Sequence, residues 1–124
     1  MSQTRVEQFK EERERLNRLV MEYAGLSIKR FHGLDAQVYR QGTLSRKTKE
    51  LLGLVASLVL RCDDCIQYHL LRCHQEGLNS AELMEALAIG LVVGGSITIP
   101  HLRGAMEVWD ELVGGKKTSG KGNR

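Results

Sequence analysis

The sequence has little that would build a β-sheet. It contains one proline among 124 residues, few runs of β-branched residues, and no segment with the two-residue alternation of a half-buried strand. It also shows no hairpin signal and no internal repeat. A chain of this length can form one hydrophobic core. We therefore expect an all-α, single-domain helical bundle.

Long hydrophobic runs are missing as well. The longest, residues 86–99, has 14 residues and includes three glycines, whereas a membrane-spanning helix needs roughly 20 apolar residues. The N-terminal segment is charged and lacks the apolar stretch of a secretory signal. These absences predict a soluble, cytoplasmic protein with no membrane partner.

Most of the chain has no excess of positive or negative charge. Residues 1–113 hold 14 Lys and Arg against all 15 Asp and Glu, so the net charge of +3 comes from four basic residues at the end. This balance does not favour a nucleic-acid partner. The last eleven residues have no apolar side chain to bury. We expect a helical domain at 1–113 and a disordered basic tail at 114–124.

About six helices are expected, because capping residues precede apolar-periodic segments and glycines follow them. The expected ranges are Thr4 to Gly25, Ser27 to Gly42, Ser45 to about Leu60, Cys62 to about Gly77, Asn79 to about Gly94, and Pro100 to about Leu112. The apolar stripe of the first helix is expected to pack on its own domain or, alternatively, on a neighbouring subunit. The second helix is expected to turn inward the side chains of Ile28, Phe31, Leu34 and Val38.

The third helix is apolar on nearly every side after Glu50, which is typical of a helix at the centre of a domain or at an interface. A carboxylate at the edge of such a run needs a partner or a chemical task. In one straight helix, Glu50 and Cys62 would lie about 18 Å apart. Glu50 can approach the cysteines only if the chain reverses after Leu60, and the polar stretch 61–64 offers a place for that turn.

Cys62 and Cys65 form a CxxC pair, and His69 follows four residues after the second thiol. On a helix all three share one face, and His69 is placed to exchange a proton with Cys65. A thiol at the start of a helix meets free N–H groups that favour the thiolate, whereas Asp63 and Asp64 oppose it. Such a pair can form a redox disulfide, hold a metal or supply a nucleophile, and a reducing compartment disfavours a purely structural disulfide.

Two other settings of a CxxC pair find less support. A zinc site needs four ligands in a tetrahedron, and one helix cannot bring Cys73 onto an ion held by the CxxC pair. His32 or His101 would have to complete the site from elsewhere. We expect Cys73 to be a small buried hydrophobe. A thioredoxin-like domain requires a βαβ context that this sequence does not supply.

Several short motifs in residues 45–112 match one family pattern. The matching text is Lys47-Thr48-Lys49-Glu50-Leu51-Leu52, then Cys62-x-x-Cys65-Ile66-x-x-x-His69, then Gly77, then Glu85-Ala86-Leu87, and then Gly94-Gly95. This part of the chain resembles the carboxymuconolactone decarboxylase family, specifically its alkylhydroperoxidase D-like branch. A Glu twelve residues before the CxxC and a His four residues after it meet that pattern in full.

The resemblance implies an all-α fold, a homotrimer or homohexamer, and a peroxidase or disulfide-reductase activity that needs no cofactor. Carried over, Cys65 attacks the hydroperoxide and Cys62 resolves the sulfenic acid as a disulfide. Glu50 and His69 pass the proton, and a dithiol donor reduces the disulfide. One position departs from the pattern: Asp64 stands where alkylhydroperoxidase D has a relay histidine.

Two alternative functions remain open from the sequence. One is a decarboxylase-type lyase in which Glu50 and His69 act as acid and base and the cysteines are incidental. The other is a non-catalytic helical module that binds a metal or a partner.

Overall fold

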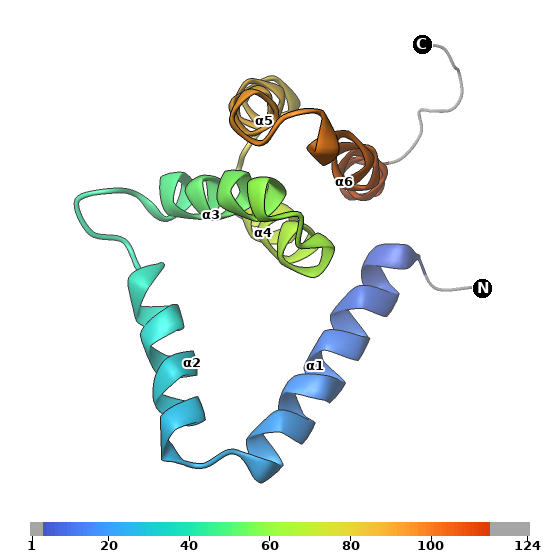
Figure 1. Ribbon diagram of the computed structural model, residues 1–124. Helices are drawn as coiled ribbons and strands as arrows, with labels where there is room; N and C mark the ends of the chain where they lie inside the picture. Colours follow the sequence, from blue (N-terminus) through green and yellow to red (C-terminus); the bar gives the residue numbers. More distant parts are fainter. Residues whose placement is uncertain (1–3, 115–124) are drawn as a thin grey trace. The chain divides into compact units, whose positions relative to one another are not determined.

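The computed structural model describes residues 4–114, drawn in Figure 1. Within these residues the regular structure consists of six α-helices and one short 3₁₀-helix, without strands, so the predicted all-α architecture is confirmed. None of these helices is long and apolar enough to cross a membrane. All of the predicted tail except Gly114 lies outside the described residues, and the boundary near residue 113 stays a prediction.

The chain divides into two compact units, residues 1–41 and 42–124. The first contains α1 (Arg5–Tyr23) and α2 (Leu26–Val38). The expected helix start at Thr4 is confirmed, and the cap is a capping box. Thr4 Oγ1 accepts a hydrogen bond from the Glu7 N–H at 3.1 Å, and Glu7 Oε1 accepts one from the Thr4 N–H at 3.1 Å.

The start of α2 differs from the prediction. The helix begins at Leu26, and Gly25, whose carbonyl accepts a bond from the Lys29 N–H at 3.2 Å, occupies the N-cap position. Ser27 lies inside the first turn, so the prediction that it caps this helix was wrong. Glycine in an extended conformation is an acceptable N-cap, and the backbone turns into the helix there before Ser27 is reached.

No residue of α1 or α2 is buried. The expectation that the α1 stripe packs on its own domain is therefore not met in the single chain. The expected inward face of α2 is also exposed, and that prediction was wrong; the side chains concerned, with exposed fractions of 47–68%, are Ile28, Phe31, Leu34 and Val38. Both stripes are unburied in the single chain.

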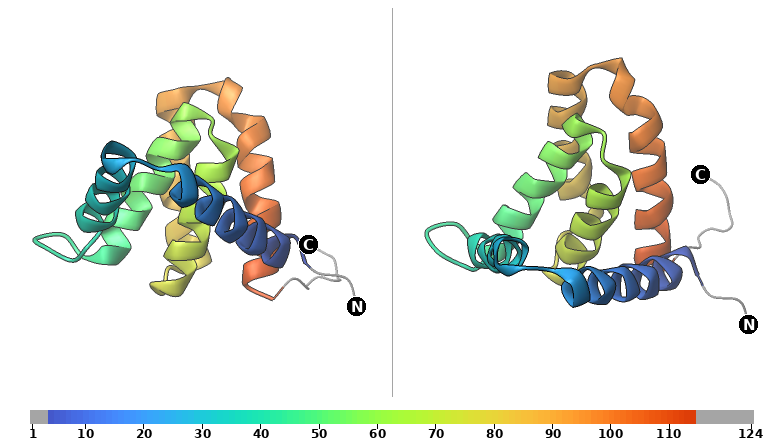
Figure 2. Two further views of the ribbon diagram at one scale, coloured as in Figure 1. Left: turned by 90° about the horizontal axis from the view of Figure 1, so that it is seen from below. Right: turned by 60° about the horizontal axis from the view of Figure 1, so that its bottom comes forward.

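The second unit contains α3 (Arg46–Leu60), α4 (Asp63–Gln75), α5 (Ser80–Gly94), the 3₁₀-helix η1 (Ser96–Thr98) and α6 (Ile99–Leu112). Consecutive helices run in roughly opposite directions (Figure 2). α3 packs on α4 and α5, and α4 packs also on α6. The core of the unit is apolar and includes Leu54, Leu58, Ile66, Leu70, Leu83, Leu87, Val108 and Trp109.

The reversal between α3 and α4 occupies two residues. Arg61 adopts a left-handed conformation with φ 59° and ψ 41°, and its N–H bonds the Leu58 carbonyl at 3.0 Å. The Cys62 N–H bonds the Ser57 carbonyl at 3.1 Å. These two bonds form a Schellman motif, which satisfies the last carbonyls of α3. The predicted turn at this point is confirmed, and it brings α4 back along α3.

Two glycines let α5 approach its neighbours closely. A Cβ atom at Gly90 would lie 2.9 Å from Leu58 Cδ2, and one at Gly94 would lie 2.6 Å from Thr98 Cγ2. Thr98 is fully buried and its hydroxyl donates to the Gly95 carbonyl at 2.8 Å. Because Thr98 is held in this way, the end of α5 requires a residue without a side chain at position 94.

Replacing Gly94 by Ala should lower the free energy of unfolding by about 1–3 kcal/mol, the usual effect of overpacking a closed core. Gly104→Ala in α6 is the matched control, because nothing lies within 4 Å of a Cβ atom there. That change should raise the unfolding free energy by about 0.5–1 kcal/mol through helix propensity. Urea unfolding at one protein concentration measures both, and equal effects of the two changes would contradict the close approach.

Candidate active site

The predicted thiol pair lies at the start of α4. Cys62 is the N-cap residue, and its Sγ accepts a hydrogen bond from the Cys65 N–H at 3.2 Å. The two cysteines form a disulfide with their Cα atoms 5.3 Å apart, inside the range that disulfides span. Cys62 is half-buried and Cys65 is exposed. In the reduced chain, the same N–H group and the positive end of the helix would stabilise a thiolate at Cys62.

Glu50 and His69 come together across the α3–α4 interface. Both are buried, Glu50 to 2% exposure, and the Glu50 Oε1 and His69 Nδ1 atoms are 2.8 Å apart. An ionised carboxylate only accepts hydrogen bonds, so Nδ1 carries the proton. The contact holds the imidazole in one orientation across the interface. The expectation that Glu50 has a partner is confirmed, and the partner lies one turn beyond Cys65.

Arg72 is a member of this group that the sequence analysis missed. Its Nε lies 3.5 Å from Glu50 Oε2, and its Nη2 lies 3.2 Å from Glu76 Oε2. The guanidinium therefore balances the buried charge of Glu50. The available signal was spacing, because Arg72 follows His69 by three residues and so lies on the same face of α4.

His101 was considered from the sequence only as a residue that could complete a zinc site. It lies in the first turn of α6, and its Nδ1 is 2.7 Å from Asp63 Oδ1, on the residue that directly follows Cys62. The two residues are 38 positions apart, so sequence spacing carried no signal for this contact. It places an imidazole beside the first turn of α4.

The third cysteine is separate from this chemistry. Cys73 is fully buried, as predicted, and burial together with the nearby charge of Glu50 raises the pKa of its thiol to about 12. It is a thiol at neutral pH. Within residues 4–114, no cluster of three or more His, Cys, Asp or Glu side chains is arranged to hold a metal ion.

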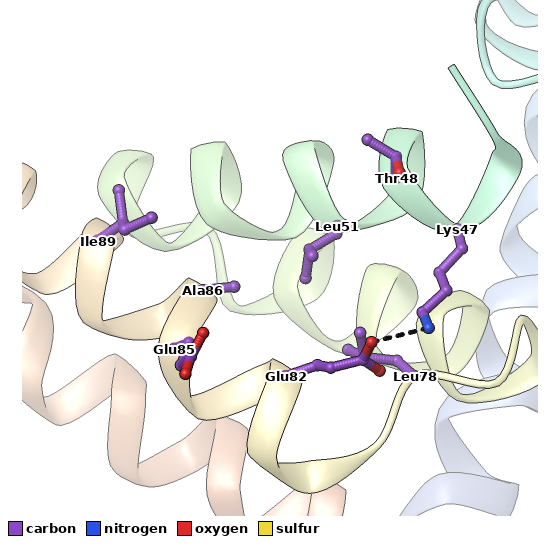
Figure 3. Close-up of a pocket in the computed structure, with 8 residues that line it drawn as sticks. All are labelled: Lys47, Thr48, Leu51, Leu78, Glu82, Glu85, Ala86 and Ile89. Atoms are coloured by element: carbon purple, nitrogen blue, oxygen red, sulfur yellow. Dashed lines mark hydrogen bonds and ion pairs between the residues drawn. The ribbon is translucent and has the colours of Figure 1, made fainter.

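A pocket of about 520 Å³ lies between the start of α3 and α5 (Figure 3). Lys47 and Glu82 point toward one another at its rim and form an ion pair at 3.0 Å. The Asn79 backbone N–H and the Lys47 ammonium group lower the pKa of Glu82. Leu51, Leu78, Ala86 and Ile89 contribute apolar lining, and the remaining lining residues are Thr48 and Glu85. The four predicted site residues do not line this pocket.

The match to a family model decides the relationship of this chain to known proteins. The model of the carboxymuconolactone decarboxylase family matches residues 27–108, which include Glu50, both cysteines of the CxxC pair and His69. The chain belongs to the carboxymuconolactone decarboxylase family. The suspected family is thereby confirmed.

Solved structures and a curated relative agree with this family. A Thermotoga maritima family member, to which a possible part in an antioxidative response is attributed, is 58% identical with a TM-score of 0.84, and 89% of this chain and 93% of that chain are covered. Another structure of the Thermotoga protein gives 57% identity and a TM-score of 0.85, covering 90% and 98%. Protein 4 of the cox locus of Paracoccus denitrificans is 30% identical, over 73% of this chain and 83% of the relative. A Legionella pneumophila family member, 23% identical with a TM-score of 0.75 over 86% and 96%, shares the fold.

The buried thiol of Cys73 should make the fold sensitive to alkaline pH. The unfolded thiol ionises around its ordinary pKa of 9.0, whereas the folded thiol holds its proton up to about 12. Between these values the unfolded state binds fewer protons, so the free energy of unfolding falls as pH rises, by at most about 1.4 kcal/mol per pH unit. Chemical unfolding across this range measures the fall.

Cys73→Ala is the control, because alanine does not titrate. The stability advantage of the native chain over this variant should shrink as pH rises above about 9. An advantage that stays constant across the range would show that Cys73 ionises equally in both states.

Proposed function

We propose that this chain is a thiol-dependent peroxidase or disulfide reductase of the alkylhydroperoxidase D-like type. One arrangement carries the proposal. The Cys62–Cys65 disulfide lies at the start of α4, and His69, one turn further along that helix, is paired with the buried Glu50 of α3. A redox pair and a proton carrier in the same helix are the parts that such a reaction needs.

The proposed reaction begins at Cys65. Its thiolate attacks one oxygen of the hydroperoxide, an S–O bond forms, the O–O bond breaks, and the leaving alkoxide takes a proton to become an alcohol. Cys62 then attacks the sulfur of the Cys65 sulfenic acid, and the departing hydroxide takes a proton to become water. Two thiols and one hydroperoxide thus yield a disulfide, an alcohol and water.

The assignment of the first step to Cys65 is supported by exposure and by spacing. Cys65 is exposed, whereas Cys62 is half-buried. His69 stands one turn after Cys65 and is oriented by the contact of its Nδ1 with Glu50, and its imidazole would receive the thiol proton and pass it on. Asp64, in the position of a relay histidine, offers no imidazole, so His69 would have to act without that second one.

The cycle closes when a dithiol donor reduces the Cys62–Cys65 disulfide by exchange and becomes a disulfide itself. We propose the cytoplasm as the site of action, because dithiol donors are kept reduced there; fractionation of cells would test this location. The antioxidative role attributed to the Thermotoga maritima relative supports a hydroperoxide as the oxidant.

One equivalent of an organic hydroperoxide should remove two free thiols from the reduced chain. Titration with a chromogenic thiol reagent in denaturant measures the loss, and peptide mapping should place the new disulfide between Cys62 and Cys65. Cys73 should remain a thiol throughout and serves as the internal control. If Cys62 and Cys65 stay reduced, the proposal fails.

A matched pair of variants tests the proton relay in the same assay. Glu50→Gln keeps the shape but removes the charge that orients His69, and should slow thiol loss by about a hundredfold, the lower end for general acid–base catalysis. Glu85→Gln removes an exposed carboxylate on α5 and should leave the rate unchanged. Equal rates for the two variants would argue against Glu50 as part of the relay.

We also propose that the chain forms a homotrimer or homohexamer. α5 leaves large apolar side chains uncovered on one face, with Ile89 61%, Val92 84% and Val93 69% exposed. Leu60 at the end of α3 is 75% exposed, and the stripes of α1 and α2 are uncovered too. Monomeric soluble proteins seldom expose so many large apolar residues on so few helices. Such residues are usually buried at the subunit interfaces of a closed, symmetric oligomer.

Light scattering at micromolar concentration should give three or six times the chain mass of 13.9 kDa. Val92→Glu should lower that mass, because a buried carboxylate without a partner opposes association. The exposed change Glu85→Gln should leave the mass unchanged. A mass equal to that of one chain would contradict the proposal.

A further inference from the structure

The contact between His101 and Asp63 joins two helix starts beside the dithiol. Asp63 is the first residue of α4, and His101 lies in the first turn of α6, with Nδ1 and Oδ1 2.7 Å apart. The α3–α4 turn and the η1–α6 connection lie toward the same end of the unit (Figure 2). An imidazole from a distant part of the chain is thereby bonded to the carboxylate that follows Cys62.

Asp63 directly follows Cys62 in the chain, so the charge of its carboxylate affects the ionisation of the Cys62 thiol. A negative charge close to a thiol disfavours the thiolate. The carboxylate of Asp63 accepts hydrogen bonds, so His101 Nδ1 is the donor. A donor bonded to the carboxylate offsets part of its charge and holds it in one position.

We propose that His101 is a positioning residue for the dithiol. By donating a hydrogen bond to Asp63, it weakens the repulsion between that carboxylate and a Cys62 thiolate, and so keeps Cys62 reactive. The biological role of this hydrogen bond rests on the proposed function. The effect of His101 on Cys62 can be tested independently of peroxide chemistry, because thiolate reactivity is measured without any hydroperoxide.

Other charged groups also stand near the start of α4. They are Arg61 in the α3–α4 turn, Asp64 in the first turn of α4, His69 one turn further with its partner Glu50 on α3, and His101 on α6. Glu50 and His69 are buried and bonded to each other. His101 contacts the carboxylate that directly follows Cys62, so its removal changes a defined interaction beside that sulfur.

The test uses the full chain with Cys65→Ser, reduced, so that Cys62 is the reactive thiol at the start of α4. Cys73, with its pKa of about 12, does not compete at neutral pH. The rate of alkylation by iodoacetamide, followed by mass spectrometry from mildly acidic to neutral pH, reports the thiolate at Cys62. Added salt should reduce the differences between variants, because Asp63 is 66% exposed and its charge is screened.

His101→Leu removes the donor and should slow alkylation about threefold, equivalent to half a unit in the thiol titration. His101→Asn is the matched control, because its amide N–H can replace Nδ1–H, and it should keep most of the rate. Asp63→Asn should speed alkylation by a similar factor. Adding His101→Leu to Asp63→Asn should then change nothing, because the charge on which His101 acts is gone.

An unchanged alkylation rate in His101→Leu would overturn the proposal. So would a His101→Leu change that slows alkylation equally when Asp63→Asn is already present. Thermal unfolding checks that the fold is intact. If His101→Leu is unstable, the other two variants decide the question. The alkylation rate of His101→Asn must then match that of the Cys65→Ser parent, and the rate of Asp63→Asn must exceed it. Failure of the proposed function shows separately, as thiols that survive hydroperoxide in the native chain.

Discussion

The buried carboxylate of Glu50 is the group on which the second unit depends. Removing an ion from water costs several kcal/mol unless opposite charges and hydrogen bonds compensate it. Here the compensation comes from His69 and Arg72 on another helix. Both lie on one face of α4, so α4 must pack on α3 in a register that presents this face to Glu50. The same register places the CxxC pair at the start of α4, one turn from His69.

That register is set by a turn of only two residues. Arg61 and Cys62 alone separate α3 from α4, and Arg61 adopts a left-handed conformation that costs an L-residue about 1–2 kcal/mol. Cys62 has two tasks, because its N–H closes the Schellman motif of α3 and its Sγ caps α4. The disulfide sulfur of Cys62 is therefore also a structural atom at a helix start. Chemistry at Cys62 and the local fold are coupled for this reason.

Local signals in the sequence were sufficient for the helices, apart from the start of α2, and for four residues of the candidate site. Side chains that cap their own helix, such as Thr4 with Glu7 and Asn79 with Glu82, are recognised from partners three residues away. Glu50 was identified because a charge in an apolar run needs a partner. His101 was missed because its partner is 38 residues away, a distance that helical periodicity cannot relate.

The exposed faces show a second limit of the sequence. Periodicity identified which side of α2 is apolar, but it does not say what covers that side, and Phe31 is exposed in the single chain. The cap of α2 failed for a related reason. Ser27 is the better capping side chain, but the helix starts where the backbone turns, at Gly25.

The first turn of α4 contains a conflict between folding and chemistry. Asp63 and Asp64 favour a helix start, because their charges complement the positive end of the dipole. The same charges disfavour a thiolate at Cys62 or Cys65. Destabilising the thiolates shifts the dithiol–disulfide equilibrium toward the disulfide, which makes the dithiol a stronger reductant. Under the proposed function this suits a protein that gives electrons to a hydroperoxide, at the expense of thiolate concentration. A hydrogen bond from His101 to Asp63 moderates one of the two charges, so the balance between reducing power and reactivity lies in that contact and in Asp64.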